Sequence, residues 1–153
     1  ALYFMMSEQD VQLALKSPFT SIGSDAASAL KEGDIDAIGL PHPRSYGTFP
    51  KIIADYVRGK KVISLPEAIR KLTSWPAARM GLANRGVLRE GLAADVVVFD
   101  LDTIEDTATW ENPTAKPTGI DYVIVNGELV LDAGTHTGRK PGHVLRGPGY
   151  QEK

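Results

Sequence analysis

Apolar and polar positions in the first part of the chain follow a pattern that predicts a strand and then a helix. The apolar run 2–6 is typical of a short buried strand. Ser7 then offers a helix N-cap, and Asp10, three residues later, approximates a capping box. The apolar residues that follow predict a helix that runs to about Leu15.

The next apolar run ends on a carboxylate. Ser17-Pro18 interrupts the helix, and residues 19–24 predict a second strand that stops at Asp25. Strand, helix and strand within so short a span indicate a βαβ unit, and hence a parallel sheet. Acids at the C-terminal ends of barrel strands are often catalytic in β/α barrels. Asp25 is therefore the first functional candidate.

Residues 26–46 predict a long loop, with a short helix over residues 26–31. Loops of this length in compact domains are usually functional or disordered. The segment 41–50 reads Pro-His-Pro-Arg-Ser-Tyr-Gly-Thr-Phe-Pro, which is too rich in aromatic and fixed-φ residues for a typical disordered linker. We therefore expect an ordered segment there.

Three helices are predicted after this loop. Apolar residues at helical spacing indicate a helix over about 50–58, which Gly59 ends. Residues 64–67, Ser-Leu-Pro-Glu, combine an N-cap, a first-turn proline and an acid at the third position, so they predict a second helix start. Trp-Pro at 75–76 starts a third helix, for which Gly81 is a good C-cap.

The remainder of the chain predicts β structure. The run 96–100 indicates a buried strand, and a long polar connection follows at 102–119. Apolar runs on either side of Asn126-Gly127 predict a hairpin, because Asn-Gly between β runs is a strong hairpin signal. From Ala133 onward the Gly/Pro-rich sequence predicts an extended strap.

The change of pattern near residue 83 divides the chain into two predicted parts. Residues 1–82 form an α/β piece and residues 83–153 a small β piece, so the predicted fold class is α/β. The chain begins at Ala1 and enters an apolar run at once, which predicts an internal start and therefore a fragment of a longer protein.

Composition excludes several classes of partner. The formal net charge of −2 gives no electrostatic basis for binding nucleic acid or an anionic membrane. The absence of cysteine excludes disulfides, thiolate metal ligands and a cysteine nucleophile within the chain, and is compatible with the cytoplasmic location we expect. No apolar run approaches the roughly 18 residues that a membrane helix needs.

Several motifs occur in an order that is similar to one enzyme family. They are Ser-Glu-Gln-Asp-Val at 7–11, Ile-Gly-Ser-Asp at 22–25, His-Pro-Arg-Ser-Tyr-Gly-Thr-Phe-Pro at 42–50, Gly-Leu-Ala-Ala-Asp-Val-Val-Val-Phe-Asp at 91–100 and Val-Asn-Gly at 125–127. The chain resembles the C-terminal third of N-acyl-D-amino-acid deacylases (D-aminoacylases), which belong to the amidohydrolase superfamily. The 42–50 segment narrows the resemblance to this branch.

The resemblance implies a fold and an activity. The expected fold is a zinc-dependent (β/α)₈ barrel flanked by a small β-sandwich. This chain would hold the last two β/α units at 1–82 and the C-terminal share of the sandwich at 83–153. The expected activity of the parent enzyme is hydrolysis of the amide bond of N-acyl-D-amino acids by zinc-activated water.

The resemblance also implies roles for three residues. Asp25 would be the general base and acid; capping of the following helical segment is the structural alternative. Arg44 would bind the substrate carboxylate through its planar fork, and a surface ion pair with Asp34 or Asp36 is the alternative. Tyr46, for which a loop-anchoring role is equally open, would wall the substrate pocket.

Histidines that would complete a metal site are missing. There is no His-x-His, and His42, His136 and His143 are interpreted as structural because metal-binding histidines usually occur at fixed spacing with others. We therefore expect no metal ligand in this chain. We also expect Zn²⁺ only in the parent enzyme and no activity of the isolated fragment.

Two other functions remain open, together with an assembly state. A cyclic amidase similar to dihydroorotase or hydantoinase is the alternative within the superfamily, and a structural or interaction module is the alternative outside it. The expected partners are the substrate and the remainder of the parent chain. Unpaired sheet edges further predict a homo-oligomer.

Overall fold

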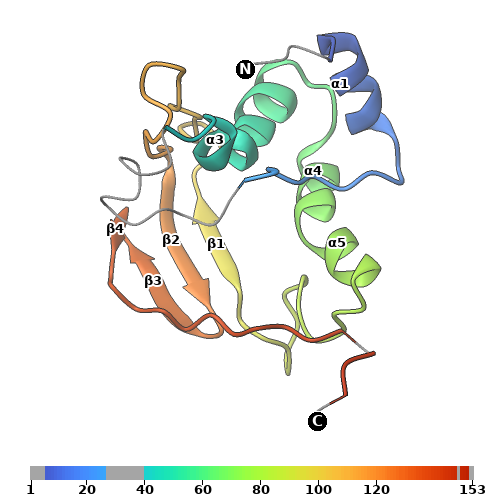
Figure 1. Cartoon of the computed structure of the whole chain (residues 1–153), viewed down its shortest axis with the longest axis vertical. Coiled ribbons are helices and arrows are strands. Elements are labelled where there is room, and N and C mark those ends of the chain that lie inside the picture. Colours follow the sequence, from blue (N-terminus) through green and yellow to red (C-terminus); the bar gives the residue numbers. More distant parts are fainter. Residues whose placement is uncertain (1–5, 27–39, 148, 152–153) are drawn as a thin grey trace.

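The computed structural model describes residues 6–26, 40–147 and 149–151. In Figure 1 the helices lie along one side of the molecule and an antiparallel sheet lies on the other. Two predicted elements, the strand at 2–6 and the helix at 26–31, fall outside the described residues except for Met6 and Ala26. Within the described part, no helix combines the length and the apolarity that a membrane crossing needs.

The first helix begins as its capping residues predict. α1 spans Glu8–Lys16, and the Ser7 hydroxyl oxygen accepts a hydrogen bond from the Asp10 backbone N–H at 3.2 Å. Glu8 then attaches α1 to the neighbouring helix, because its carboxylate accepts from the Tyr56 hydroxyl at 3.2 Å and from the Lys60 ammonium at 2.6 Å. Hydrogen bonds, chiefly the one from Lys60, lower the pKa of Glu8 to about 2.

The predicted strand at 19–24 is wrong, and so is the parallel sheet inferred from it. Residues 20–26 belong to no helix or strand, although Figure 1 shows the segment before Asp25 as a drawn-out trace, and the sheet in the described residues is antiparallel. Extended backbone forms a strand only beside a neighbouring strand that supplies ladder hydrogen bonds. Here the main-chain contact is to a helix, where the Ile22 N–H donates to the Lys71 carbonyl at 3.3 Å.

The helix predicted at 50–58 begins earlier and changes its hydrogen-bonding pattern. α3 spans Arg44–Lys51 and continues directly into η1, a π-helix over Ile52–Gly59. The end at Gly59 is confirmed, whereas the start is six residues too late. The sequence concealed the first turns because Gly47 is a poor helix former and Pro50 lacks an N–H.

The next two helices follow their sequence signals. α4 spans Leu65–Leu72, and the Ser64 hydroxyl oxygen accepts from the Glu67 N–H at 3.3 Å. α5 spans Ser74–Arg79 and ends at Gly81, whose φ is +71°. The N–H groups of residues 81 and 82 donate to the carbonyls of residues 78 and 77, which is the paired hydrogen bonding of a Schellman motif.

The β part is a single meander. Its strands follow one another in the order β1-β2-β3-β4 and are all antiparallel: β1 Val96–Phe99, β2 Ile120–Val125, β3 Glu128–Asp132 and β4 Thr135–His136. The strand at 96–100 and the hairpin are confirmed, since Asn126 and Gly127 have φ values of +48° and +82°. A second tight turn, at Ala133 (φ +44°) and Gly134 (φ +77°), adds β4 to what was predicted as strap.

The core lies between the helices and joins them to the start of the sheet. Its buried members come from α1, η1, α4 and the connection after β1: Leu15, Ile52, Ile53, Tyr56, Ala68 and Ile104. Phe99 and Ile120, at the facing ends of β1 and β2, pack against this cluster. Burial of an aliphatic or aromatic side chain contributes about 1.5–3 kcal/mol, so this cluster is the main apolar link between the two regions.

A polar contact reinforces that link. The Arg58 guanidinium at the end of η1 donates to the backbone carbonyls of Leu101, Asp102 and Ile104 at 2.8–3.0 Å, and pairs with the Glu105 carboxylate. These carbonyls belong to the turn that follows β1 and have no ladder partner of their own. Arg58 therefore holds this turn against the helices.

The close approach of residue 119 to this turn provides a stability test. A Cβ at Gly119 would lie 2.4 Å from the Ile104 nitrogen, and its φ of +72° disfavours any side chain. Gly119→Ala should lower the free energy of unfolding by roughly 3 kcal/mol or more, because left-handed strain and a backbone clash add. Urea unfolding followed by circular dichroism measures this.

Gly91→Ala is the matched control. Gly91 has a φ of +84°, but a Cβ there meets nothing within 4 Å. Gly91→Ala should therefore lower the free energy of unfolding only by the left-handed strain, roughly 1–2 kcal/mol. Equal losses for the two variants would contradict the close packing of residue 119 on Ile104.

Candidate active site

Asp25 closes the extended segment that follows α1. Its φ of +51° is unusual for a residue with a side chain, and its side chain is 85% exposed. The chain therefore turns sharply at this residue and presents the carboxylate to solvent. Such a position suits a group that must reach another molecule better than one that supports a core.

Arg44 forms an ion pair with Asp25. It is the first residue of α3, and its Nη2 lies 2.8 Å from the Asp25 Oδ2. Two candidates that are 19 positions apart in the sequence therefore form one ion pair. The alternative partners of Arg44, Asp34 and Asp36, lie outside the described residues.

Tyr46 follows on the same helix. It is half-buried, whereas Phe49, one turn further along α3, is 48% exposed. The helix therefore carries an arginine and two aromatic residues within two turns, and of these Arg44 contacts Asp25. Sequence inspection found these residues but placed Arg44 and Tyr46 in a loop rather than on a helix.

His42 makes two contacts within the protein. Its Nδ1 accepts a hydrogen bond from the Arg44 backbone N–H at 3.0 Å, and its ring contacts the edge of Trp110 at a centroid distance of 4.7 Å. Burial and the nearby Arg44 charge lower the pKa of His42 below its usual value, so the neutral ring that can accept this bond is favoured.

A hollow of about 270 Å³ lies beside Arg44. Residues from two distant parts of the chain line it: His42, Pro43, Arg44, Thr48 and Lys51 from the start of α3, and Asp106, Ala108, Thr109 and Trp110 from the connection between β1 and β2. Burial opposes the charge of Lys51, but the hydrogen bond to Asp55 and the charges of Asp55 and Asp106 raise its pKa overall. The hollow therefore carries positive charge at one wall and carboxylate at the other.

Sequence reasoning missed Lys51 and Asp106 as neighbours of Arg44. They are 55 positions apart and carry no motif. One signal was present in Gly47, because a Cβ there would lie 2.1 Å from the Asp106 carboxylate oxygen. A glycine inside a helix often marks such a close approach, although the sequence alone does not say to what.

Comparison with known proteins identifies the protein family. A profile of the amidohydrolase family matches residues 35–131, which is more than half of the chain. The chain belongs to the amidohydrolase family. This confirms the superfamily that the sequence motifs indicated.

Individual relatives of this amidohydrolase chain narrow the resemblance. A D-aminoacylase from Alcaligenes xylosoxydans xylosoxydans is 45% identical over 95% of the chain, and an N-acyl-D-glutamate deacylase from the same organism is 40% identical over 95%. A dihydroorotase from Lactobacillus acidophilus is more distant, at 29% identity over 69% of the chain. The chain spans 28% of the length of the two deacylases.

Solved structures agree with these relatives. A D-aminoacylase with a binuclear metal centre superposes with a TM-score of 0.80 at 42% identity, covering 90% of this chain and 27% of that one. An N-acyl-D-glutamate deacylase from Bordetella bronchiseptica, complexed with zinc and a phosphonate inhibitor, gives 0.75 at 41% identity, covering 84% and 25%. The branch indicated by the 42–50 segment is thereby confirmed.

The described residues of this amidohydrolase chain do not themselves form a metal site. Within residues 6–26, 40–147 and 149–151, no group of three histidine, aspartate or glutamate side chains lies close enough together to hold an ion. Asp25 offers a carboxylate, but its contact is Arg44. The donor set present here therefore does not fit a complete zinc site, which needs about four ligands.

The packing of α3 on the Asp106 loop can be tested by a double-mutant cycle. Gly47→Ala should destabilise the protein by about 1 kcal/mol, because overpacking of roughly 1–3 kcal/mol exceeds the helix preference for alanine. In the Asp106→Ala background the same change should stabilise it by about 1 kcal/mol. Additive effects in denaturant unfolding would contradict the contact.

Proposed function

We propose that this chain forms the proton-transfer and carboxylate-binding part of a metal-dependent enzyme that hydrolyses N-acyl-D-amino acids to a carboxylate and a free D-amino acid. The identity to D-aminoacylase and to N-acyl-D-glutamate deacylase supports the reaction class. In this proposal residues 1–82 belong to a (β/α)₈ barrel and residues 83–153 to a flanking β-sandwich. The remainder of a longer chain completes both and supplies the metal ligands.

The observation that carries the proposal is the contact between Asp25 and Arg44. The two side chains lie 2.8 Å apart, and both are accessible. In an N-acyl amino acid a single carbon separates the carboxylate from the scissile amide nitrogen. A substrate whose carboxylate lies on Arg44 therefore brings its amide within reach of Asp25.

Each residue has a defined role in the proposed reaction. Arg44 donates paired hydrogen bonds to the substrate carboxylate, which takes the place of Asp25 on the guanidinium. Asp25, thus released, accepts a proton from the water that attacks the acyl carbon, and returns it to the nitrogen as the C–N bond breaks. Tyr46, two residues beyond Arg44 on α3, walls the substrate pocket in this proposal. A metal ion held by the remainder of the longer chain would lower the pKa of the attacking water.

Acyclic substrates are favoured over cyclic ones. Identity falls from 45% for D-aminoacylase to 29% for dihydroorotase, and the chain length covered falls with it. The His-Pro-Arg-Ser-Tyr-Gly segment at 42–47 is not required by a cyclic amidase. We therefore assign N-acyl-D-amino acids rather than dihydroorotate or hydantoins.

The carboxylate role of Arg44 predicts a change in substrate preference. In the zinc-loaded protein that contains this chain and the metal-binding remainder, Arg44→Lys should raise KM for an N-acetyl-D-amino acid roughly 10- to 100-fold. Lysine keeps the charge but loses the planar fork, and a hydrogen bond to a charged group is worth about 1.5–3 kcal/mol. Steady-state kinetics on N-acetyl-D-methionine and N-acetyl-D-glutamate measure KM.

The corresponding α-carboxamides of the same substrates are the control. They lack the carboxylate, so Arg44→Lys should change their kcat/KM far less. An equal loss on acids and amides would show that Arg44 does not bind the carboxylate.

The proton-transfer role of Asp25 predicts a loss of kcat. Asp25→Asn should lower kcat by roughly 10²–10⁴-fold with bound zinc unchanged, since a positioned general base contributes about that factor. Asp121→Asn, which makes the same change at an exposed carboxylate of β2, should retain activity. Turnover in Asp25→Asn equal to that of the control would refute the assignment.

A further inference from the structure

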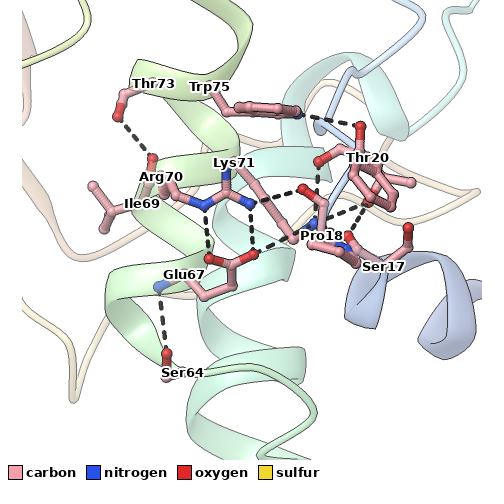
Figure 2. Close-up of polar contacts among 11 residues, drawn as sticks. Ser17, Pro18, Thr20, Ser64, Glu67, Ile69, Arg70, Lys71, Thr73 and Trp75 are labelled. Atoms are coloured by element: carbon pink, nitrogen blue, oxygen red, sulfur yellow. Dashed lines mark hydrogen bonds and ion pairs between the residues drawn. The ribbon is translucent and has the colours of Figure 1, made fainter.

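Lys71 is a fully buried lysine that carries out no step of the proposed reaction. Its side chain is 0% exposed, and the nearest carboxylate, Glu67, is 3.6 Å away. Beside this ion pair, its ammonium donates to the Ser17 carbonyl, to the Thr20 carbonyl at 3.1 Å and to the Thr20 hydroxyl at 2.9 Å. Figure 2 shows these contacts converging on the segment that follows α1.

Two neighbours of Lys71 bind the carbonyls in between. The Arg70 guanidinium donates to the Pro18 carbonyl at 3.0 Å, and the Trp75 indole N–H donates to the Phe19 carbonyl at 3.2 Å. Arg70 is itself fixed by two bonds of 2.8 Å to the Glu67 carboxylate. Four consecutive carbonyls, those of residues 17–20, are thus bound from α4 and α5 (Figure 2). We call Arg70, Lys71 and Trp75 the carbonyl clamp.

The carbonyl clamp lies directly before Asp25 in the chain. Beyond residue 20 the segment makes one further main-chain bond, from Ile22 to the Lys71 carbonyl, and then turns at Asp25. No strand among the described residues pairs with this segment. The carbonyl clamp is therefore the main contact that fixes the position of the backbone leading to Asp25, and hence where its carboxylate contacts Arg44.

The burial of an ammonium argues for a specific requirement. Removing a cation from water is costly, and an apolar side chain of similar length would fill the same space without that cost. Without Lys71, however, the part-buried carbonyl of Thr20 would lose its donor, and that of Ser17 would keep only the bonds from Thr20. A lysine can both fill this space with its aliphatic stem and donate to two backbone carbonyls with its ammonium.

We propose that Lys71 is a positioning residue for Asp25: by binding the carbonyls of Ser17 and Thr20 it holds the extended segment so that the Asp25 carboxylate reaches the substrate amide. The catalytic part of this inference rests on the proposed function. The mechanical part concerns the backbone of residues 21–25 and stands apart from any activity.

Lys71→Met tests both parts, because methionine keeps the length and loses the donors. Hydrogen exchange at the Ile22 amide, which donates to the Lys71 carbonyl, should accelerate at least 10-fold, with the amides of α4 little changed. With zinc bound, kcat for N-acetyl-D-amino acids should fall roughly 100-fold, the loss that a misplaced group causes. KM should stay within about threefold, because Arg44 sits on α3 and not on the clamped segment.

Lys16→Met is the matched control. Lys16 is exposed and lies one residue before the clamped segment, so exchange and kcat should equal those of the wild-type protein. If Lys71→Met does not fold, Trp75→Phe tests the positioning role instead. It removes the hydrogen bond to Phe19, keeps an aromatic face for Arg70 and Arg79, and should give a smaller loss of kcat at constant KM.

The outcomes separate the two proposals. Wild-type protein without deacylase activity would refute the proposed function, while the exchange rates would still decide whether Lys71 holds residues 21–25. Unchanged exchange and unchanged kcat in Lys71→Met, or parallel changes in kcat and KM in Trp75→Phe, would overturn the positioning role.

Discussion

Backbone carbonyls that have no strand partner must find donors elsewhere, and the described structure depends on how this is solved. A part-buried carbonyl without a hydrogen bond is unfavourable, so the segments at 17–20 and 101–105 need hydrogen-bond donors as well as apolar contacts. Each is bound instead by a long cationic side chain from a helix, Lys71 in one case and Arg58 in the other. Irregular backbone thereby has hydrogen-bond partners for its carbonyls, as the backbone of a sheet does.

The candidate site follows from these anchors rather than from its own charges. Asp25 and Arg44 are both substantially exposed, and an exposed ion pair contributes about 0–1 kcal/mol. That is too little to bring two distant segments together. The packing of the surrounding elements brings the two segments together. The ion pair then shows that Arg44 can bind a carboxylate at this position. A weak pair is also one that a substrate carboxylate can replace at low cost.

The sequence predicted best what is decided locally. The capping residues Ser7 and Ser64 and the Asn126-Gly127 turn were read correctly, because a cap or a tight turn depends on neighbours a few residues away. The predicted strand at 19–24 failed because a strand exists only beside another strand. The start of α3 was missed because Gly47 is tolerated there through a contact with a distant loop.

The residues of the candidate site divide in the same way. Asp25, Arg44 and Tyr46 were found because they lie in motifs that resemble a family. Lys51, Asp106 and Lys71 were not found, because their significance lies in partners 50 or more positions away. Ala133, which forms the turn before β4, gave no signal because alanine seldom takes a positive φ.

The π-helical pattern of η1 constrains how such chains can diverge. In η1 the hydrogen bonds reach one residue further back than in an α-helix, as in the bond from the Lys60 N–H to the Asp55 carbonyl. Loss of a single residue would restore the α-helical pattern but rotate everything beyond it by about 100°. Arg58 would then point away from the turn it holds. A one-residue deletion in η1 would thus separate the helices from the turn after β1, whereas a substitution that keeps the helix length would not.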